Sequence, residues 1–288
     1  MSTPQPARGV TIASWLIRTA IFLHLLGVAA LIFNRAGTAI GNIAFMEWEY
    51  ADLQVYLAER CVIVALLAIA ATLFVYPTTV AAVILGSAVL LETTAVYHFE
   101  GTLFSDWSHP ALAMRFLAPF ALIPLIAMPK KEPQAAWRYE MCGWIMRVGV
   151  ASVFIAHGLE ALYRHPQFID LIIGSTRRWI GYRPTESQAI AVLVPIGIMD
   201  VIVGVLLLCG RWRPLLCEMA FWGFITAMSR VTANGPLSYP EVLMRASHFL
   251  IPLAILQIGP ALDAAKARRR ASEEGAPEGS GAELSPAT

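Results

Sequence analysis

Trp15-Leu16-Ile17-Arg18 and Trp144-Ile145-Met146-Arg147 are two apolar stretches in which a tryptophan precedes an arginine by three residues. The two tryptophans lie about 129 residues apart. Met114-Arg115 and Met244-Arg245 form a second pair at a spacing of about 130 residues, and each opens a further apolar segment. A spacing kept this closely at two places indicates an internal duplication. Arginine costs several kcal/mol at the centre of a bilayer, so its recurrence at matched positions needs an explanation.

The composition is that of a helical membrane protein. The chain is 57% hydrophobic and 14% charged, whereas soluble domains carry about 25% charged residues. Apolar runs of roughly 20 residues, the length that spans a bilayer as a helix, recur along the chain. We therefore expect an all-α, polytopic membrane protein whose partner is the lipid bilayer. The net charge of +1 and the lack of a basic patch with interleaved aromatic residues give no indication of nucleic-acid binding.

The apolar runs predict about eight transmembrane helices, arranged as two parallel units of four. Turn-forming residues such as Tyr76-Pro77 and Asn234-Gly235-Pro236 separate them. The predicted spans are 12–33, 54–75, 78–98, 111–128, 141–163, 188–209, 213–231 and 242–258. The chain then divides into an N-terminal segment (1–11), a first unit (12–128), a linker (129–139), a second unit (140–258) and a tail (259–288).

The direction of the chain follows from this count. Four helices return the chain to its starting side, so the two units run parallel about a pseudo-twofold axis along the membrane normal. Lys and Arg are more frequent on the side of the termini, which predicts an inner-membrane protein with both termini in the cytoplasm. Arg18 and His24 interrupt the first apolar run, so we expect a retained helix and not a cleaved signal peptide. The tail is rich in Glu, Gly, Ser, Pro and Ala, and we expect it to be disordered.

The four cysteines stand singly in or beside apolar segments, without a C-x-x-C pair. We therefore expect neither a dithiol nor a zinc or iron–sulfur site, and no other metal site. Each cysteine is interpreted as a small hydrophobic residue of the helix packing.

The second half resembles a known family. Arg147 and the run Phe154-Ile155-Ala156-His157-Gly158-Leu159-Glu160-Ala161-Leu162 resemble the first helix of DoxX-type membrane proteins, which has an arginine near its start and a phenylalanine followed by His-Gly. The run from Asp200 to Leu208, closing on Gly210-Arg211-Trp212-Arg213-Pro214, resembles their second helix. The resemblance covers about residues 140–258 and implies a four-helix membrane unit associated with quinone-linked sulfur oxidation and redox stress complexes. DoxX-type proteins usually have a lysine where this chain has Ala161.

Polar residues of the second half collect toward the non-cytoplasmic side in this topology. His157 and Glu160 are three residues apart and share a helix face, as do Arg245 and His248. Asp200 lies near the middle of the next predicted span. We predict a ligand-binding site formed by His157, Glu160, Asp200, Arg245 and His248, with His157 and Asp200 as the candidate catalytic residues.

This set of residue types suits the head group of a quinone, the cofactor that we expect. A histidine and an arginine would donate to its carbonyl oxygens, and a carboxylate would pass protons. Two facing histidines are also able to ligate haem. The alternative is structural, because Arg–Asp and Arg–Glu pairs inside a membrane also hold helices together. We favour that role, or snorkelling to the interface, for Arg18 and Arg147.

The sequence leaves three functions open. The first is a component of a quinone-linked membrane oxidoreductase, which would need a soluble or membrane-bound redox partner because no redox centre is visible in the chain. The second is a proton-coupled carrier of a small solute, for which ionisable residues at depth are suited. The third is a non-catalytic assembly or cargo-binding subunit.

Overall fold

The computed structural model describes residues 5–34, 36–100, 104–126 and 135–274 of the chain. Within these ranges every regular element is a helix. The first half contains α1 (Gln5–Phe33), α2 (Ala39–Met46), α3 (Asp52–Val75), α4 (Thr79–Glu100), the 3-10 helix η1 (Ser105–Trp107) and α5 (Ser108–Ile126). The second half contains α6 (Ala135–Leu162), α7 (Pro166–Ile180), α8 (Glu186–Cys209), α9 (Arg213–Asn234), η3 (Pro236–Ser238), α10 (Tyr239–Met244) and α11 (Ala246–Glu274).

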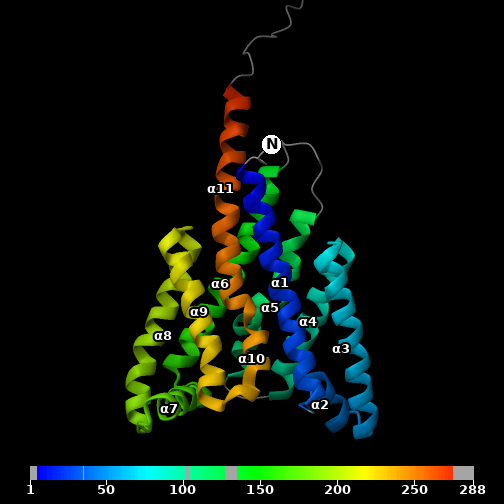
Figure 1. Cartoon of the computed structure of the whole chain (residues 1–288), viewed down its shortest axis with the longest axis vertical. Coiled ribbons are helices and arrows are strands. Elements are labelled where there is room, and N and C mark those ends of the chain that lie inside the picture. Colours follow the sequence, from blue (N-terminus) through cyan, green and yellow to red (C-terminus); the bar gives the residue numbers. More distant parts are fainter. Residues whose placement is uncertain (1–4, 35, 101–103, 127–134, 275–288) are drawn as a thin grey trace, which may run out of the picture.

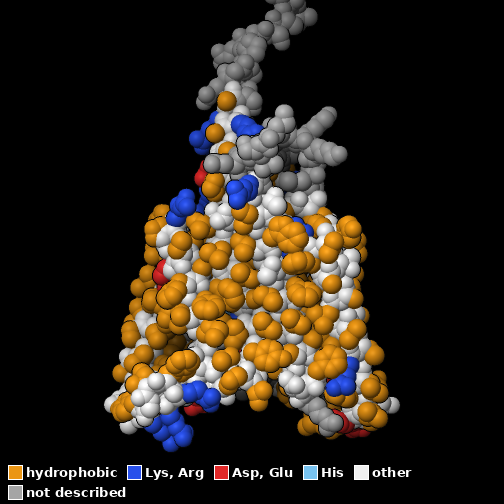
Figure 2. All heavy atoms as spheres, in the orientation of Figure 1, with side chains coloured by type: hydrophobic (Ala, Val, Ile, Leu, Met, Phe, Trp, Pro, Cys, Tyr) orange, Lys and Arg blue, Asp and Glu red, His pale blue; other side chains and the backbone are white. Residues whose placement is uncertain are grey.

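Seven of the described helices are long and apolar enough to cross a membrane, namely α1, α3, α4, α5, α6, α8 and α11. The chain is therefore an all-α, multi-pass membrane protein, as its composition predicted. Most side chains on the visible flank of the bundle are hydrophobic, while charged side chains gather toward its two ends (Figure 2). This distribution is the one expected of a surface in contact with lipid.

The eighth predicted span, 213–231, is the helix α9. It is 22 residues long and lies among the other long helices (Figure 1), but it carries Arg213, Glu218 and Arg230 and is not one of the seven apolar spans. The long helices alternate in direction, so α1 begins at the end of the bundle where α11 finishes (Figure 1). Both ends of the described chain therefore lie on one side of the molecule.

The packing of the helices in the first half recurs in the second. α3 packs on α1 as α8 packs on α6, and α4 packs on α5 as α9 packs on α11. The short helix α2 contacts α3 and α4, and α7 contacts α8 and α9 in the same way. Between the halves, α1 packs on α11 and α5 on α6. Such a repetition is what a duplicated unit would produce.

The two Trp–Arg stretches make the same contacts in each half. The Arg18 guanidinium stacks 4.5 Å from the Trp15 ring centroid and donates to the Phe74 carbonyl at 2.9 Å. The Arg147 guanidinium stacks 4.1 Å from the Trp144 centroid and donates to the carbonyls of Leu207 at 3.0 Å and Leu208 at 2.6 Å. The last carbonyls of a helix lack partners within it. Each arginine thus completes the C-terminal end of the helix beside it.

Several boundaries differ from the prediction. α11 continues to Glu274, so residues 259–274 of the predicted tail are helical, because they are rich in Ala, Arg, Lys and Glu, which favour helices. α1 begins at Gln5 and α6 at Ala135, so the predicted N-terminal segment and linker are partly helical. The rest of these predicted segments, in 1–4, 129–134 and 275–288, lies outside the described residues, as do residues 127–128 of the fourth predicted span. The short helices α2, α7 and α10 were not predicted.

Candidate functional site

A cavity of about 420 Å³ lies in the second half between α6, α7, α8, α9 and the start of α11. Its volume is within the range of small-molecule sites. Most of the wall is apolar, with side chains such as Val153, Leu171 and Ile196. The cavity is open at the surface of the molecule, and Ile225 of α9, one of its lining residues, is exposed.

The structure brings four of the five predicted site residues to this cavity. His157 on α6, Asp200 on α8, Arg245 before α11 and His248 on α11 all line it. Glu160 does not line it but is buried behind His157, and the two side chains are 2.8 Å apart between Nδ1 and Oε2. His157 and His248, about 90 positions apart in the sequence, therefore line the same cavity.

Several polar atoms at the cavity have no hydrogen-bond partner among the described residues. They include His248 Nε2 and Arg230 Nε, and both side chains are buried. The buried Asp200 carboxylate lies beside the Trp222 side chain, a potential hydrogen-bond donor. The His157 and His248 rings lie 5.7 Å apart between centroids. Buried polar groups are nearly always paired in native proteins, so unpaired ones in a cavity wall are available to a ligand.

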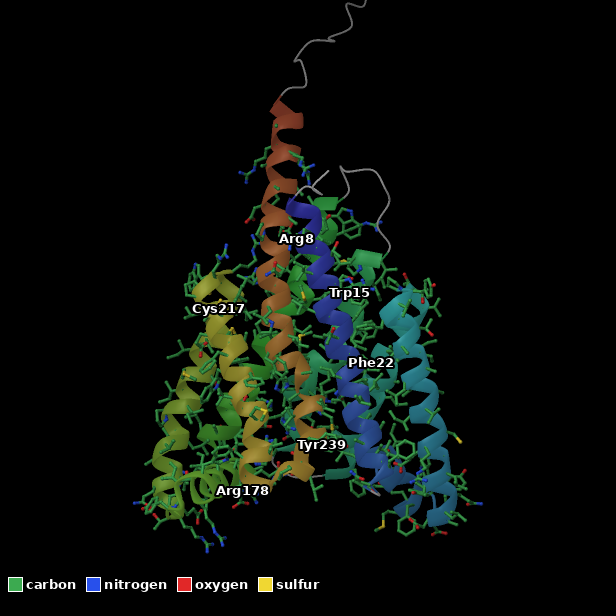
Figure 3. The ribbon with its side chains drawn as sticks, in the orientation of Figure 1. Arg8, Trp15, Phe22, Arg178, Cys217 and Tyr239 are labelled. Carbon is green, nitrogen blue, oxygen red and sulfur yellow. The ribbon has the colours of Figure 1, made fainter. Side chains whose placement is uncertain are left out.

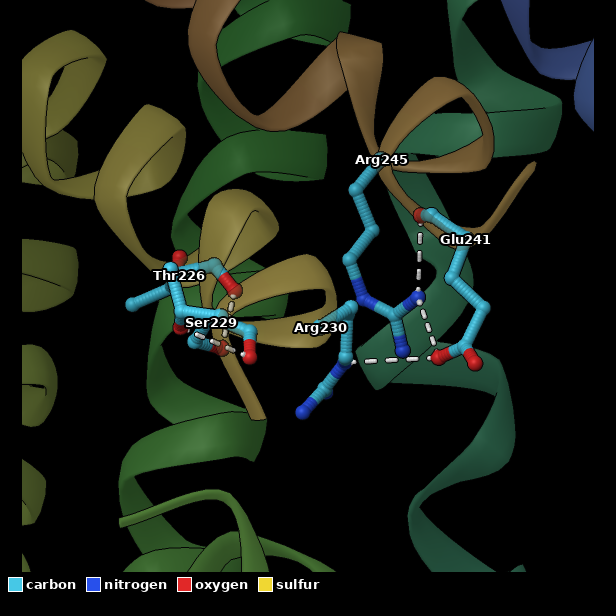
Figure 4. Close-up of polar contacts among 6 residues, drawn as sticks. Thr226, Ser229, Arg230, Glu241 and Arg245 are labelled. Carbon is cyan, nitrogen blue, oxygen red and sulfur yellow. Dashed lines mark hydrogen bonds and ion pairs between the residues drawn. The ribbon is translucent and has the colours of Figure 1, made fainter. Parts of the chain in front are cut away.

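Arg230 of α9 belongs to the same cavity, although the sequence analysis did not include it in the site. Its side chain is 8% exposed, and its Nε lies 3.6 Å from Glu241 Oε2, too far for a hydrogen bond. Arg245 Nη1 lies 3.7 Å from the same oxygen and donates to the Glu241 carbonyl at 3.1 Å (Figure 4). Glu241 on α10 thus holds two guanidinium groups at the cavity.

Further charged side chains lie near the two arginines that line the cavity. Arg115 of α5 lies within electrostatic range of Arg245, Arg230 and Glu241, and its Nε is buried without a hydrogen-bond partner among the described residues. Glu160 is within electrostatic range of Arg230 and Arg245. Three arginines therefore gather near two carboxylates.

One face of α9 adds hydroxyl groups that the sequence analysis missed. Thr226, Ser229 and Thr232 line the cavity, and each hydroxyl donates to a carbonyl of α9 three residues before it. Ser229 and Thr226 lie beside Arg230 in Figure 4. Ser175 of α7 shares a hydrogen bond of 2.7 Å with the Thr232 hydroxyl, which ties α7 to α9. The signal in the sequence is the spacing of three between these small polar residues.

Glycines bring α6 and α8 together beside the site. A Cβ atom at Gly158 would lie 2.7 Å from the Gly197 carbonyl oxygen, and one at Gly197 would lie 2.7 Å from the Gly158 carbonyl oxygen. Only glycine fits at such a crossing, where small residues let helix backbones approach. The crossing places His157 and Asp200, one and three residues away, on facing helices.

His165 precedes α7, outside the membrane spans, and supports the floor of the cavity. Its Nδ1 accepts a hydrogen bond of 3.2 Å from the backbone N–H of Gln167 in the first turn of α7. Burial lowers the pKa of His165, with Glu160 opposing this shift and His157 and Arg230 adding to it. A neutral ring keeps the lone pair that the hydrogen bond requires.

The corresponding place in the first half holds a second cavity, of about 540 Å³, between α1, α2, α3 and α4. Glu59 and Glu92 line it, but their carboxylates are engaged with the N-terminus of α2. Glu59 accepts from the Thr38 backbone N–H at 2.7 Å, and Glu92 accepts from the Ala39 N–H at 2.7 Å. The acidic residues of the first half therefore hold α2 in place.

Comparisons with known proteins gave no match. No family model, no curated protein and no solved structure matches the chain.

Proposed function

We propose that the protein binds a quinone in the cavity of its second half, as an inner-membrane component of a quinone-linked, DoxX-like oxidoreductase complex. The observation that carries this proposal is the convergence of His157, Asp200, Arg245 and His248 on one apolar cavity that opens at the surface of the molecule. A quinone is soluble in the bilayer, so a site open to lipid suits its entry. The resemblance of residues 140–258 to DoxX-type proteins supports the same area of biology.

The polar groups of the cavity match the hydrogen-bonding requirements of a quinone head group. Arg230 Nε is a buried donor without a hydrogen-bond partner among the described residues, and His248 Nε2 is free to donate in one of its tautomers. Both suit carbonyl oxygens. The Asp200 carboxylate, beside Trp222, is an acceptor, which suits a hydroxyl of the reduced ligand. The apolar wall suits the ring and its substituents.

A bound quinone would supply the redox chemistry, because it takes up two electrons and two protons on reduction. The chain's own contribution is binding, orientation and proton transfer. Asp200 can hold or release a proton at its carboxyl, and the His157–Glu160 pair can do so at the imidazole. Glu241 fixes Arg230 and Arg245 so that their donors stay at the polar end. Electrons would come from a soluble or membrane-bound partner.

The test is quinone binding by the full chain in nanodiscs. Trp222 lines the cavity, so we expect added quinone to quench its fluorescence, and Trp222→Phe to remove that signal. Asp200→Asn and His157→Ala should each weaken binding about tenfold, the equivalent of one lost hydrogen bond of about 1.4 kcal/mol. Quinone should also be found in protein purified from native membranes.

Two variants far from the cavity serve as controls. Asp263→Asn removes an exposed carboxylate of α11, which forms an ion pair with Arg211. His109→Ala removes a histidine of the first half. Both should bind quinone as the wild type does. Absence of binding by the wild type, or equal binding by all four variants, would refute the proposal.

A proton-coupled carrier is the second candidate, and the repeated helix packing of the two halves favours it. Many transporters are built from two repeats of this kind. In proteoliposomes, a carrier would move protons when its solute is added, and Asp200→Asn would abolish that movement. Proton flux without any quinone binding would replace the first proposal with this one.

A further inference from the structure

The helix α7 connects two membrane spans and lies across the end of the bundle opposite to the chain termini (Figure 1). The span before it ends at Leu162, and the span after it begins at Glu186. α7 therefore lies at the level where both spans leave the bilayer. Its apolar side faces the protein, where Ile169 is buried against a cluster that includes Ala189 and Leu193.

The C-terminal end of α7 and the turn after it are exposed. Trp179 is 73% exposed and Ile180 is 75% exposed. Among the large apolar residues of the second half, only Leu237 is more exposed. They lie between arginines, and Gly181 ends the helix with a left-handed backbone at φ +74°. We refer to this region as the α7 basic patch, which consists of Arg177, Arg178, Trp179, Ile180, Tyr182 and Arg183. This patch was not recognised from the sequence, in which no basic patch with interleaved aromatic residues was expected.

The positive charge of this patch is not balanced by nearby contacts. The side chains of Arg177 and Arg183 make no ion pair or hydrogen bond within the part of the chain that the structure describes. Arg178 (Figure 3) lies against Gly235 at the end of α9, because a Cβ atom there would be 2.9 Å from its Nη1. Between 164 and 186 the sequence has four arginines against two carboxylates, a net charge of +2 with histidine neutral. Figure 2 shows basic side chains at the lower left edge, where α7 lies in Figure 1.

Arginines beside exposed tryptophan and isoleucine are typical of a helix in the head-group region of a membrane. Guanidinium groups bind phosphate oxygens with two parallel hydrogen bonds. Tryptophan and aliphatic side chains beside them enter the boundary between head groups and acyl chains. Water alone would leave the apolar part of the patch unburied. The phosphate of a zwitterionic lipid is balanced by the cation of its own head group, so only an anionic lipid neutralises the net positive charge of the patch.

We propose that the α7 basic patch binds the phosphate head groups of anionic phospholipids, with Trp179 and Ile180 inserted at the acyl boundary. The bound lipid holds α7 in the plane of the interface. Because Phe168, Leu171 and Ile172 of α7 also line the cavity, the lipid fixes one wall of that cavity. The binding of the lipid does not depend on which ligand the cavity takes.

The experiment uses the full chain in nanodiscs of phosphatidylcholine that contain a small fraction of brominated lipid, which quenches nearby tryptophans. The signal of Trp179 is the difference between the wild type and Trp179→Phe. We expect brominated phosphatidylglycerol to quench Trp179 at least threefold more strongly than brominated phosphatidylcholine at the same mole fraction. In the triple variant Arg177→Gln, Arg178→Gln, Arg183→Gln, we expect the two brominated lipids to quench Trp179 equally.

The matched control removes three arginines at the other end of the molecule, with Arg268→Gln, Arg269→Gln and Arg270→Gln on α11. This variant has the same change in net charge and should keep the preference of Trp179 for the anionic lipid. Equal quenching of wild-type Trp179 by both lipids would overturn the proposal and leave an acidic protein as the alternative partner. The proposal would also be overturned if the anionic lipid still quenched Trp179 more strongly in the variant that lacks Arg177, Arg178 and Arg183.

Discussion

At the scale of single residues, the same side-chain types serve two different purposes in this chain. Arg18 and Arg147 have their donors directed at helix ends, where carbonyls need partners. Arg230 and Arg245 share one carboxylate at a cavity instead. The difference lies in the number of protein acceptors around each guanidinium. An arginine with few acceptors from the protein is the one that remains available to a ligand.

We expect Arg147→Gln to destabilise the fold. It removes two hydrogen bonds from a charged donor to Leu207 and Leu208, and such bonds contribute about 1.5 kcal/mol or more each. The unfolding temperature in detergent should fall by several degrees. Arg138→Gln is the control, because Arg138 also stacks on a tryptophan, Trp137, while its Nε and Nη1 make no hydrogen bond among the described residues. An equal fall in both variants would show that the helix-end contacts contribute nothing.

At the scale of the elements, the contact between α6 and α8 sets the geometry of the site. A side chain at Gly197 must push against the Gly158 carbonyl, so the two helices would have to separate. His157 and Asp200 lie next to this crossing, so a separation of α6 and α8 would also move these two side chains apart in the cavity.

We therefore expect Gly197→Val to lower the unfolding free energy by about 1–3 kcal/mol, as overpacking does, and to weaken ligand binding. Gly143→Ala on α6, the helix that α8 crosses at Gly197, is the control, since nothing lies within 4 Å of its added Cβ. That variant should be neutral or stabilising by up to about 1 kcal/mol. Thermal unfolding in detergent measures both, and a Gly197→Val protein as stable as Gly143→Ala would contradict the close packing.

At the scale of the whole molecule, the direction of α9 decides the topology. Seven apolar spans would leave the termini on opposite sides of the membrane, whereas α9 as an eighth crossing returns the chain to its starting side. The alternating helix directions in Figure 1 favour eight crossings.

Cysteine labelling in cells tests this directly. In a variant without native cysteines, we expect Arg213→Cys and Leu237→Cys, at the two ends of α9, to react with a membrane-impermeant reagent from opposite sides. Both positions are exposed in the structure, so a lack of reaction is not expected from burial. Labelling of Leu237→Cys but not Arg213→Cys in intact cells would place both termini in the cytoplasm. Labelling of both from one side would exclude α9 as a crossing.

The sequence predicted where each long helix lies, because uninterrupted apolar runs of this length have few other structures open to them. The ends were less accurate, since α11 continues to Glu274 and its predicted span ends at 258. It missed α7, whose apolar residues are spaced among charges and lie in what was predicted as a loop. Four of the predicted site residues reach one cavity because ionisable side chains in apolar runs are conspicuous. Arg230 and the hydroxyls of α9 were missed, since one sequence does not tell which face of a polar-rich helix turns inward.

The length of α11 has a practical consequence. At 1.5 Å per residue, its 29 residues measure roughly 43 Å, whereas the hydrocarbon core of a bilayer is about 30 Å thick. α11 is the helix that projects furthest from the bundle (Figure 1), so its basic last turns stand clear of the hydrocarbon on the side of the chain termini. Lys266 pairs with Glu140 of α6 at 2.8 Å and braces the base of this projection. A fluorescent protein or affinity tag fused at the C-terminus would be held away from the lipid, which makes it the end of choice for attachment.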